Sequence, residues 1–442
     1  MENLLTKSIE KFLTATQNKE ILVISHHDTD GITSASIMTR ALQRQDLRFS
    51  IKIFKQLEKE NISHLPEDKI IIFLDLGSSH ISELSKLKTE IFIIDHHELP
   101  EDLDKKTMPS NVTLINPHLI NEEEISASGL TYLFVKKLND NNKDLASLGV
   151  IGLVGDYLSQ SISKLSNDLI KDSEVKIKRG LLIYPATRPI NKALEYSTSI
   201  FIPGVTGSQK GVLDLLGECG IEKENGAYKS IIELDEEENS KLITGILLRR
   251  MKKDNEDIIG NIYLIKFFNK LEDARELSAL INACGRLDSP EIAIGLCLGN
   301  KNYRKKAEEI YASYKQHIIA GLNNVEKIQK IQGKGYLILN AQDKIKDTII
   351  GTVASILSNS SVYDEGTILV AMAYSQDKIK VSARITGKEG RNLREMLHSV
   401  TQQIGGECGG HHMAAGCIIQ KNKEPEFLET IKKTLDIETV KI

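Results

Sequence analysis

The chain has 442 residues, of which 40% are apolar and 27% charged, and its formal net charge at pH 7 is −4. This length predicts two or more domains, and the composition is that of an ordinary globular protein rather than a disordered chain. The nearly balanced charge excludes a uniformly basic surface, so a nucleic-acid partner would need a local basic groove.

The N-terminal segment, residues 1–20, predicts an amphipathic, charged helix without the apolar core or cleavage site of a signal peptide. No apolar run approaches the roughly 20 residues that span a bilayer. The five cysteines are an odd number and form no Cys-x-x-Cys pair, which is typical of a reducing compartment. We therefore expect a cytoplasmic protein with no membrane partner.

The first third of the chain alternates short apolar runs with helical patterns such as residues 32–45 and 80–88. Several runs are continuously apolar, as expected for strands of a parallel sheet that is covered on both faces. The predicted strands are residues 20–25, 49–54, 70–76, 90–96 and 112–117. This pattern predicts a doubly wound, mainly parallel five-stranded α/β domain, in which ligands bind at the carboxyl ends of the strands.

The rest of the chain predicts helices over 127–160, a long charged helix over 301–328, and a second α/β unit that ends in a Gly-rich stretch at 405–416. Residues 186–265 are less regular and carry a strongly charged segment. The predicted organisation is an N-terminal α/β domain at 1–185, an inserted or accessory region at 186–265, a return to the first domain at 266–300, a connecting helix at 301–330 and a smaller C-terminal α/β domain at 331–442.

Acidic and imidazole side chains gather where three of the predicted strands end. They are His26, His27, Asp28 and Asp30 after the first strand, Asp75 at the third, and Asp95, His96 and His97 at the fourth. Because the carboxyl ends of parallel strands share one edge of the sheet, we expect these groups to converge. Asp156 adds a carboxylate inside a predicted apolar helix, where an unpaired charge is costly to bury.

Mixed Asp and His donors without thiolates suit Mn²⁺ or Mg²⁺ better than a structural zinc ion. Six or seven such groups suffice for two ions that share a bridging carboxylate, an arrangement that stabilises charge on a transferring phosphoryl group. Any one of these residues alone is equally well explained as a helix cap or a surface group. Their combination favours a two-metal site.

Four segments, HHDTDG (26–31), LDLGSS (74–79), IDHH (94–97) and VGDY (154–157), resemble the four motifs of the DHH phosphoesterase superfamily, which is named after the Asp-His-His at 95–97. The C-terminal GGECGGHHMAAG (405–416) resembles the signature of the DHH-associated domain. The segment DARELSALINACGR (273–286) resembles a stretch of archaeal RecJ-like single-strand-specific exonucleases. Together these motifs bracket residues 20–416.

This resemblance implies ligand roles for the matching positions. One ion would be held by His26, Asp28 and Asp75, and the other by Asp30, Asp75, His96 and Asp156, so that Asp75 bridges the two. His97 would face the scissile phosphate rather than a metal. Bacterial RecJ proteins place an acid where this chain has His26, whereas a histidine is similar to other DHH branches. The implied cofactors are two divalent cations, with Mn²⁺ preferred and Mg²⁺ as the alternative.

The resemblance also implies substrate-binding residues. Arg286 would contact the phosphate near the metals, although a domain-joining salt bridge is the structural alternative. In the second domain, Arg384, Gly409, Gly410 and His411 would hold the terminal nucleotide or phosphate, since glycines let backbone N–H groups approach an anion. An exposed strand arginine and a simple turn are the corresponding structural alternatives for Arg384 and the glycines.

We therefore expect a metal-dependent, RecJ-like exonuclease that hydrolyses single-stranded DNA, RNA or both to nucleoside 5′-monophosphates by a two-metal mechanism, in DNA replication or repair. The catalytic residues would be Asp75, His97 and Arg286. A replication-helicase or repair-helicase protein is the expected partner, docking on residues 186–265. The alternatives are a small-substrate phosphoesterase acting on oligoribonucleotides, adenosine bisphosphate or cyclic dinucleotides, and a non-catalytic replication scaffold.

Overall fold

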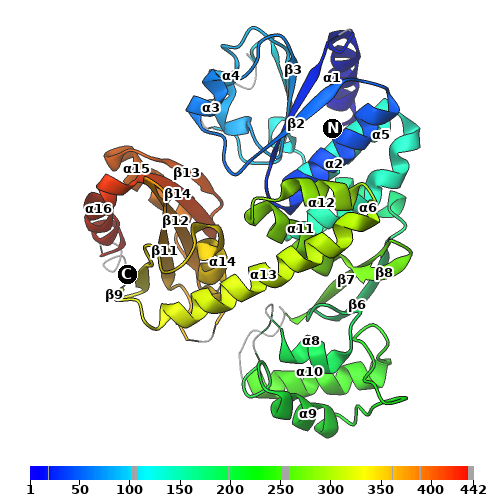
Figure 1. Ribbon diagram of the computed structural model, residues 1–442, viewed down its shortest axis with the longest axis vertical. Coiled ribbons are helices and arrows are strands. Elements are labelled where there is room, and N and C mark those ends of the chain that lie inside the picture. Colours follow the sequence, from blue (N-terminus) through cyan, green and yellow to red (C-terminus); the bar gives the residue numbers. More distant parts are fainter. Residues whose placement is uncertain are drawn as a thin grey trace. The chain divides into compact units, whose positions relative to one another are not determined.

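The computed structural model describes residues 1–17, 19–100, 103, 108–197, 200, 202–250, 258–360, 362–387 and 390–436, and its elements are labelled in Figure 1. The chain forms two compact units, Met1–Tyr311 and Ala312–Ile442. Each unit has its own central sheet and its own hydrophobic core.

A five-stranded parallel sheet lies at the centre of the first unit, which confirms the predicted doubly wound domain. Its strands are β1 (Ile21–His26), β2 (Phe49–Phe54), β3 (Ile70–Leu74), β4 (Ile91–Ile94) and β5 (Val112–Ile115). They are ordered β2-β1-β3-β4-β5, and Ile21 pairs with Phe49 on one side and with Ile70 on the other. The order reverses between β1 and β3, so the carboxyl ends of these strands flank the crevice where such sheets bind ligands.

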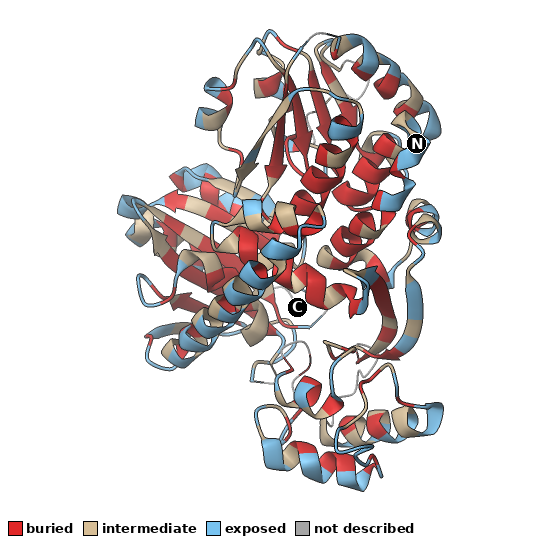
Figure 2. Cartoon of the chain, turned by 45° about the vertical axis from the view of Figure 1, so that its right-hand side comes forward, coloured by how far each residue is buried: buried red, intermediate tan, exposed pale blue. Residues whose placement is uncertain are grey.

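Different helices cover the two faces of this sheet. Alternate strand residues point to opposite faces, so Ile21 and Val23 enter one core while Leu22 and Ile24 enter another. The first core includes residues of α1 (Glu2–Ala15), α2 (Thr29–Arg44), α5 (Ala127–Leu138), α6 (Ala146–Gly155), α7 (Lys164–Asp172), α11 (Ala274–Arg286) and α12 (Pro290–Cys297); the second includes residues of α3 (Lys59–Ser63) and α4 (Ile81–Leu84). Strands β1, β3 and β4 are buried along nearly their whole length (Figure 2), which explains their apolar sequences, whereas the edge strand β2 is only partly buried.

Short 3-10 segments connect these elements. They are η1 (Ser78–His80), η2 (Pro117–Leu119), η3 (Asp140–Leu145) and η4 (Leu158–Gln160). Two of them follow residues of the predicted metal site: η1 begins three residues after Asp75, and η4 begins two residues after Asp156. The loops that carry these acids are therefore tightly wound rather than extended.

The accessory region, residues 186–265, has a hydrophobic core of its own. Its helices are α8 (Ile190–Glu195), α9 (Gln209–Glu218) and α10 (Glu236–Arg250), and the antiparallel sheet β6-β7-β8 consists of β6 (Lys176–Leu181), β7 (Ile259–Phe267) and β8 (Lys270–Asp273). Ile262 and Leu264 of β7 belong to the accessory core, whereas Tyr263 and Ile265 belong to the core of the parallel sheet. This strand thus ties the two cores together, one on each face.

The helix α13 (Lys301–Val325) begins in the first unit and ends in the second. The second unit has a six-stranded sheet ordered β13-β14-β12-β11-β10-β9, in which β10 and β11 pair in parallel and the other neighbours pair antiparallel. Its strands are β9 (Lys330–Gly333), β10 (Tyr336–Asn340), β11 (Ile368–Ser375), β12 (Lys378–Ile385), β13 (Glu407–Gly410) and β14 (Ala414–Gln420), and its helices are α14 (Asp347–Ser358), α15 (Leu393–Ile404), η6 (Lys421–Lys423) and α16 (Glu424–Asp436).

The Gly-rich stretch at 405–416 forms a hairpin. Gly409 of β13 lies opposite Gly416 of β14, and β14 continues into the sheet by pairing with β12. The sequence does not reveal these strands because glycine has no side chain, so the alternation of side chains that marks a strand is missing. No helix within the described ranges is long and apolar enough to cross a membrane.

Candidate metal centre

The turn that follows β1 carries the first acid-and-imidazole group. His26 is the last residue of β1, and the Asp28 side chain caps α2 by accepting a hydrogen bond from the Gly31 N–H at 3.0 Å. His26 Nδ1 lies 3.0 Å from Asp28 Oδ2. A Cβ atom on residue 31 would lie 2.5 Å from the His26 carbonyl oxygen, so this tight turn requires glycine.

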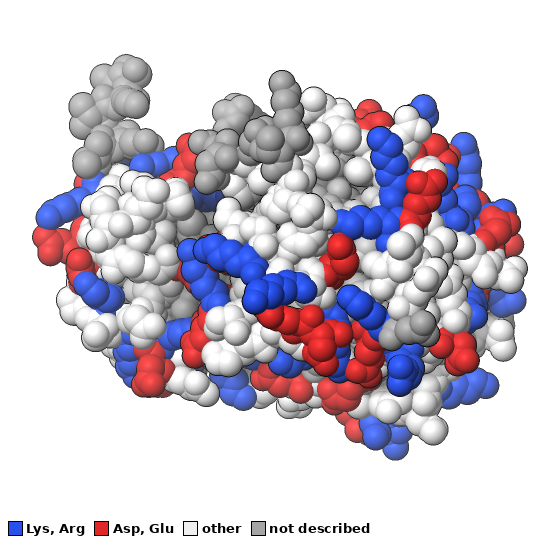
Figure 3. All heavy atoms as spheres, turned by 90° about the horizontal axis from the view of Figure 1, so that it is seen from above, with Lys and Arg blue, Asp and Glu red and all other residues white. Residues whose placement is uncertain are grey.

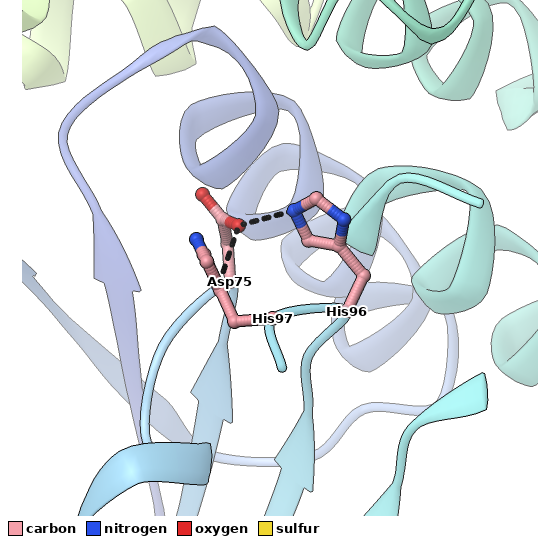
Figure 4. A group of neighbouring side chains, drawn as sticks. All are labelled: Asp75, His96 and His97. Carbon is pink, nitrogen blue, oxygen red and sulfur yellow. Dashed lines mark ion pairs between the residues drawn. The ribbon is translucent and has the colours of Figure 1, made fainter. Parts of the chain in front are cut away.

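Asp75 directly follows β3 and lies between the groups from β1 and β4. Its backbone is left-handed, at φ 60°, and the residue is only 2% exposed. Its Oδ2 atom lies 3.3 Å from His26 Nδ1. Its Oδ1 atom lies 3.6 Å from His96 Nε2 and 3.9 Å from His97 Nδ1 (Figure 4). The two oxygens of one buried carboxylate therefore face imidazoles from two different strands.

Asp156 lies at the end of α6, so the expectation of a carboxylate inside a helix is wrong. The helix ends at Gly155 because Tyr157 is left-handed, at φ 59°, and cannot continue it. Asp156 Oδ2 lies 2.9 Å from His96 Nε2. A Cβ atom on residue 155 would lie 2.8 Å from Thr29 Cβ, so the end of α6 packs directly against the turn that follows β1. This packing brings Asp156 to the carboxyl edge of the sheet.

Three sets of donor atoms in the described residues could hold a metal ion, with the atoms of each set within 4.8 Å of one another. The sets are His26, Asp28 and Asp75; Asp75, His96 and His97; and Asp30, His96 and Asp156. They overlap at Asp75 and at His96. All six residues predicted as metal ligands are thus brought together at one edge of the sheet, with His97 beside them.

The donor set fits divalent cations because it concentrates acids in a buried place. Burial, followed by the charges of Asp28, Asp30 and Asp156, raises the pKa of Asp75 well above its ordinary value. Burial and the charge of Asp156 raise the pKa of Asp30 to about 7. A cation would relieve this repulsion, and carboxylate and imidazole donors without thiolates suit Mn²⁺ or Mg²⁺.

The same acids also shift the pKa values of the imidazoles His26 and His96. Burial opposes a positive charge on His96, but Asp156, with smaller contributions from Glu124 and Asp75, raises the pKa of this imidazole well above its ordinary value. Burial likewise opposes the charge on His26, and Asp28 reverses the effect, so that the pKa of His26 is also raised.

Asp30 also binds the N-terminal end of α5, a structural role that the sequence does not reveal. Its Oδ2 accepts a hydrogen bond from the Ala127 N–H at 2.6 Å, and its Oδ1 accepts one from the Ser128 N–H at 3.0 Å. These donors belong to the first turn of α5, whose N-cap is Ser126. The carboxylate therefore also accepts hydrogen bonds from buried N–H groups at the start of a helix, which have no partner within that helix. Asp30 ties α5 to the candidate metal centre.

Asp95, the first residue of the triplet, holds His97 in place. Its Oδ1 lies 2.7 Å from His97 Nδ1 and accepts a hydrogen bond from the His96 N–H, while its Oδ2 accepts one from the Ser78 N–H. Burial opposes the charge of Asp95, but the contacts with His97 and His96 hold the pKa of this carboxyl far below its usual range. The sequence assigns no role to Asp95. The only signal in the sequence is its place in the Asp95-His96-His97 triplet. The His97 side chain is 40% exposed, and its Nδ1 atom faces Asp95.

Arg286, the last residue of α11, also lies near the centre. A Cβ atom on Gly285 would lie 1.6 Å from the His27 carbonyl oxygen, so α11 ends in direct contact with the turn after β1. The charge of Arg286 opposes the protonation of His26, which places the guanidinium within electrostatic reach of that imidazole. His27 itself belongs to none of the donor sets.

Charges of both signs are mixed on the molecular surface. On the face drawn in Figure 3, Lys and Arg side chains alternate with Asp and Glu side chains rather than forming one basic field. Close to Arg286, Lys55 Nζ forms an ion pair with Asp288 Oδ1 at 2.7 Å.

The second unit contains the other predicted substrate-binding residues, which are Arg384, Gly409, Gly410 and His411. Arg384 of β12 pairs with Ala414 of β14, and the His411 N–H donates a hydrogen bond to the Ala414 carbonyl oxygen at 2.9 Å. Arg384 and His411 thus lie at the same end of β14. The Arg384 guanidinium is oriented by a 2.9 Å hydrogen bond from Nε to the Ser355 hydroxyl, a contact that no sequence signal pointed to.

The fold and the site together define a doubly wound α/β protein with a candidate divalent-metal centre at its topological switch point. Family models agree with this class. The DHH family, N-terminal domain, matches residues 20–153, the DHH-CID domain matches residues 184–258, and the DHHA1 domain matches residues 333–436. The chain belongs to the DHH superfamily and is a RecJ-like member of it.

Two sequence relatives illustrate the range of similarity. An uncharacterized protein of Methanocaldococcus jannaschii is 29% identical over 450 residues, covering 97% of this chain and 98% of its own. The single-stranded-DNA-specific exonuclease RecJ of Bacillus subtilis is 23% identical over 447 residues, covering 95% of this chain and 46% of its own. The chain therefore spans about half the length of that RecJ.

Solved structures share the fold. RecJ from Thermus thermophilus, crystallised with Mn²⁺, matches with a TM-score of 0.61 at 19% identity, over 97% of this chain and 54% of its own. CDC45 from Entamoeba histolytica matches with a TM-score of 0.65 at 14% identity, over 97% of this chain and 98% of its own. At these identities the likeness concerns the architecture alone.

Proposed function

We propose that this chain is a metal-dependent exonuclease that hydrolyses the phosphodiester bonds of single-stranded DNA, RNA or both and releases nucleoside 5′-monophosphates. The observation that carries the proposal is the overlap of three metal-capable donor sets at Asp75 and His96. The name of the B. subtilis relative, a single-stranded-DNA-specific exonuclease, supports the substrate class.

Two divalent cations, Mn²⁺ in preference to Mg²⁺, would be held by the donor sets. His26, Asp28 and Asp75 would hold one, and Asp30, Asp75, His96 and Asp156 the other. The two oxygens of Asp75 suit the bridging role because one faces His26 and the other faces His96. When bound, the cations would supply an activated water nucleophile and charge stabilisation for the phosphoryl group.

The chain's own side chains would position the substrate. Arg286, which ends α11 against the turn after β1, would pair with a phosphate oxygen, since a guanidinium is a planar donor suited to phosphate. His97 would donate from Nε2, because Asp95 occupies its Nδ1 atom. A buried carboxylate that orients an imidazole fixes its tautomer and supports its positive charge.

In the second unit, Arg384, Gly409, Gly410 and His411 would bind the terminal nucleotide or phosphate. A Cβ atom on residue 409 would meet no heavy atom within 4 Å, so the strand is open at this point. Ser355 would act as a positioning residue through its hydrogen bond with Arg384. A replication-helicase or repair-helicase protein is our proposed partner for residues 186–265, most of which the DHH-CID model matches (184–258).

The proposal is tested with end-labelled single-stranded DNA and RNA, and with the matching duplexes, digested in Mn²⁺ or Mg²⁺ while the products are sized over time. We expect stepwise shortening of the single strands, no shortening in chelator, and loss of hydrolysis with retained strand binding in Asp75→Ala. Asp168→Asn is the matched control, because Asp168 is 58% exposed and pairs only loosely with Lys171, at 3.9 Å.

The outcomes separate the candidate functions. Metal-dependent cleavage retained in Asp75→Ala would contradict the proposed site. Strand binding without any cleavage by the unaltered chain would favour the non-catalytic scaffold. Cleavage restricted to very short oligonucleotides or cyclic dinucleotides, with long strands untouched, would favour the small-substrate phosphoesterase.

A further inference from the structure

Tyr157 is the residue that follows Asp156, and it is 91% exposed. Its backbone is left-handed, with φ 59° and ψ 14°. A residue with a bulky side chain rarely adopts this conformation, which costs free energy relative to glycine. Within the described residues its side chain makes no hydrogen bond, ion pair or ring contact. Neither packing nor backbone geometry therefore explains an aromatic residue at this position.

The position of Tyr157 is fixed relative to the candidate metal centre. Consecutive Cα atoms lie about 3.8 Å apart, and the neighbouring Asp156 side chain lies 2.9 Å from His96. On the N-terminal side of Tyr157, Gly155 packs against Thr29. Thr29 is the residue between Asp28 and Asp30 in the first motif. The backbone of Tyr157 thus lies directly beside the cluster that would hold the metals, and its ring is exposed.

The C-terminal side of Tyr157 is equally well anchored. The Gln160 side chain makes two hydrogen bonds with the backbone of Asn261 in β7. Gln160 Nε2 donates to the Asn261 carbonyl oxygen at 3.1 Å, and the Asn261 N–H donates to Gln160 Oε1 at 3.0 Å. The Tyr263 hydroxyl, in the same strand, donates a hydrogen bond to the Ser159 carbonyl oxygen at 2.6 Å. A rigid loop therefore presents an aromatic ring to solvent.

We propose that Tyr157 is a stacking platform for an unpaired nucleobase of the strand whose phosphate lies at the metal centre. The inference rests on the proposed function, since it names a subsite for the same substrate. Stacking on an aromatic face is available to every base and requires the base to be unpaired. A ring that is exposed, unpartnered and rigidly held beside the centre meets this requirement.

This subsite bears on specificity because aromatic residues are scarce in the chain. Only 5% of residues are Phe, Tyr or Trp, and Trp is absent. Most contacts with a single strand would therefore be made to its phosphates, which double-stranded nucleic acid also offers. A platform next to the scissile phosphate adds a contact that a paired base cannot make. It favours single strands without selecting a sequence.

The test measures binding of the full chain to a fluorescein-labelled 12-nucleotide oligothymidylate, and to an abasic strand of the same length, in EDTA. We expect Tyr157→Ala to weaken oligothymidylate binding about 5- to 150-fold, to leave abasic binding unchanged, and to keep the slope of log affinity against log salt. Tyr157→Phe and Tyr157→Trp should bind like the unaltered chain, since both keep the ring. Tyr196→Ala is the matched control, because Tyr196 is 67% exposed but lies in the accessory region, after α8.

A second variant excludes a purely structural explanation. Tyr157→Gly relieves the left-handed backbone, so it should melt at the same or a higher temperature and yet lose the same binding as Tyr157→Ala. Equal binding of oligothymidylate by Tyr157→Ala and the unaltered chain would overturn the inference alone. If the unaltered chain bound no single strand, the proposed function would fail and the inference with it. An equal loss in Tyr196→Ala would overturn the placement of the subsite.

Discussion

Lowering the pH should weaken metal binding by a magnitude that can be worked from one carboxyl group. The pKa of Asp30 is raised to about 7, by burial and by the charge of Asp156. A raised carboxyl pKa means that a proton occupies the ligand at neutral pH and must leave before a cation binds. Metal affinity should therefore fall as the pH falls through 7.

For a pKa of about 7, roughly a tenth of the Asp30 carboxyl groups carry a proton at pH 8 and roughly nine tenths at pH 6. Competition at this group alone lowers the apparent affinity about tenfold between the two pH values. Asp75, His26 and His96 also have raised pKa values and act in the same direction. The total decrease should therefore exceed tenfold.

Titration with Mn²⁺ at pH 8 and pH 6, with free Mn²⁺ measured by electron paramagnetic resonance, gives the two affinities. Calorimetry in buffers of different ionisation enthalpy counts the protons released. Asp30→Asn should bind less tightly and show a shallower pH dependence, whereas Asp168→Asn should behave like the unaltered chain. Equal Mn²⁺ affinity at the two pH values would refute the reasoning.

Two further predictions concern residues that position the centre. Gly285→Ala should lower the free energy of unfolding by about 1–3 kcal/mol or more, because its Cβ would lie 1.6 Å from the His27 carbonyl oxygen. The control is Gly217→Ala in α9, where a Cβ meets nothing within 4 Å. This substitution should raise the free energy of unfolding by about 0.5–1 kcal/mol. Denaturant unfolding measures both, and a stable Gly285→Ala would be inconsistent with the contact. Asp95→Asn should lower kcat about 10²- to 10⁴-fold with Mn²⁺ affinity nearly unchanged, because Asp95 holds His97 rather than a metal; a selective loss of Mn²⁺ affinity would argue against that division.

The parallel sheet of the first unit was predictable because the features that determine it are local in the sequence. Strands such as β3 and β4 are buried on both faces and therefore read as apolar runs, as in Ile70–Leu74. Parallel strands share their carboxyl edge, which predicted that His26, Asp75 and His96 would meet. The structure places the Asp75 carboxylate 3.3 Å from His26 and 3.6 Å from His96.

Other features depend on contacts that sequence patterns do not carry. The helical pattern continues past Asp156, but α6 ends there because Tyr157 adopts a left-handed backbone that its residue type does not announce. Asp30 accepts hydrogen bonds from backbone groups at Ala127 and Ser128, far along the chain. The hairpin at 405–416 was missed because its glycines leave no alternation of side chains.

The most direct test of a two-metal exonuclease measures bound Mn²⁺ and single-strand hydrolysis on the same sample. We predict two Mn²⁺ ions per unaltered chain together with release of mononucleotides, and fewer than two ions with no hydrolysis in Asp75→Ala. Two ions bound by Asp75→Ala, or hydrolysis by that variant at the rate of the unaltered chain, would contradict a centre bridged by Asp75.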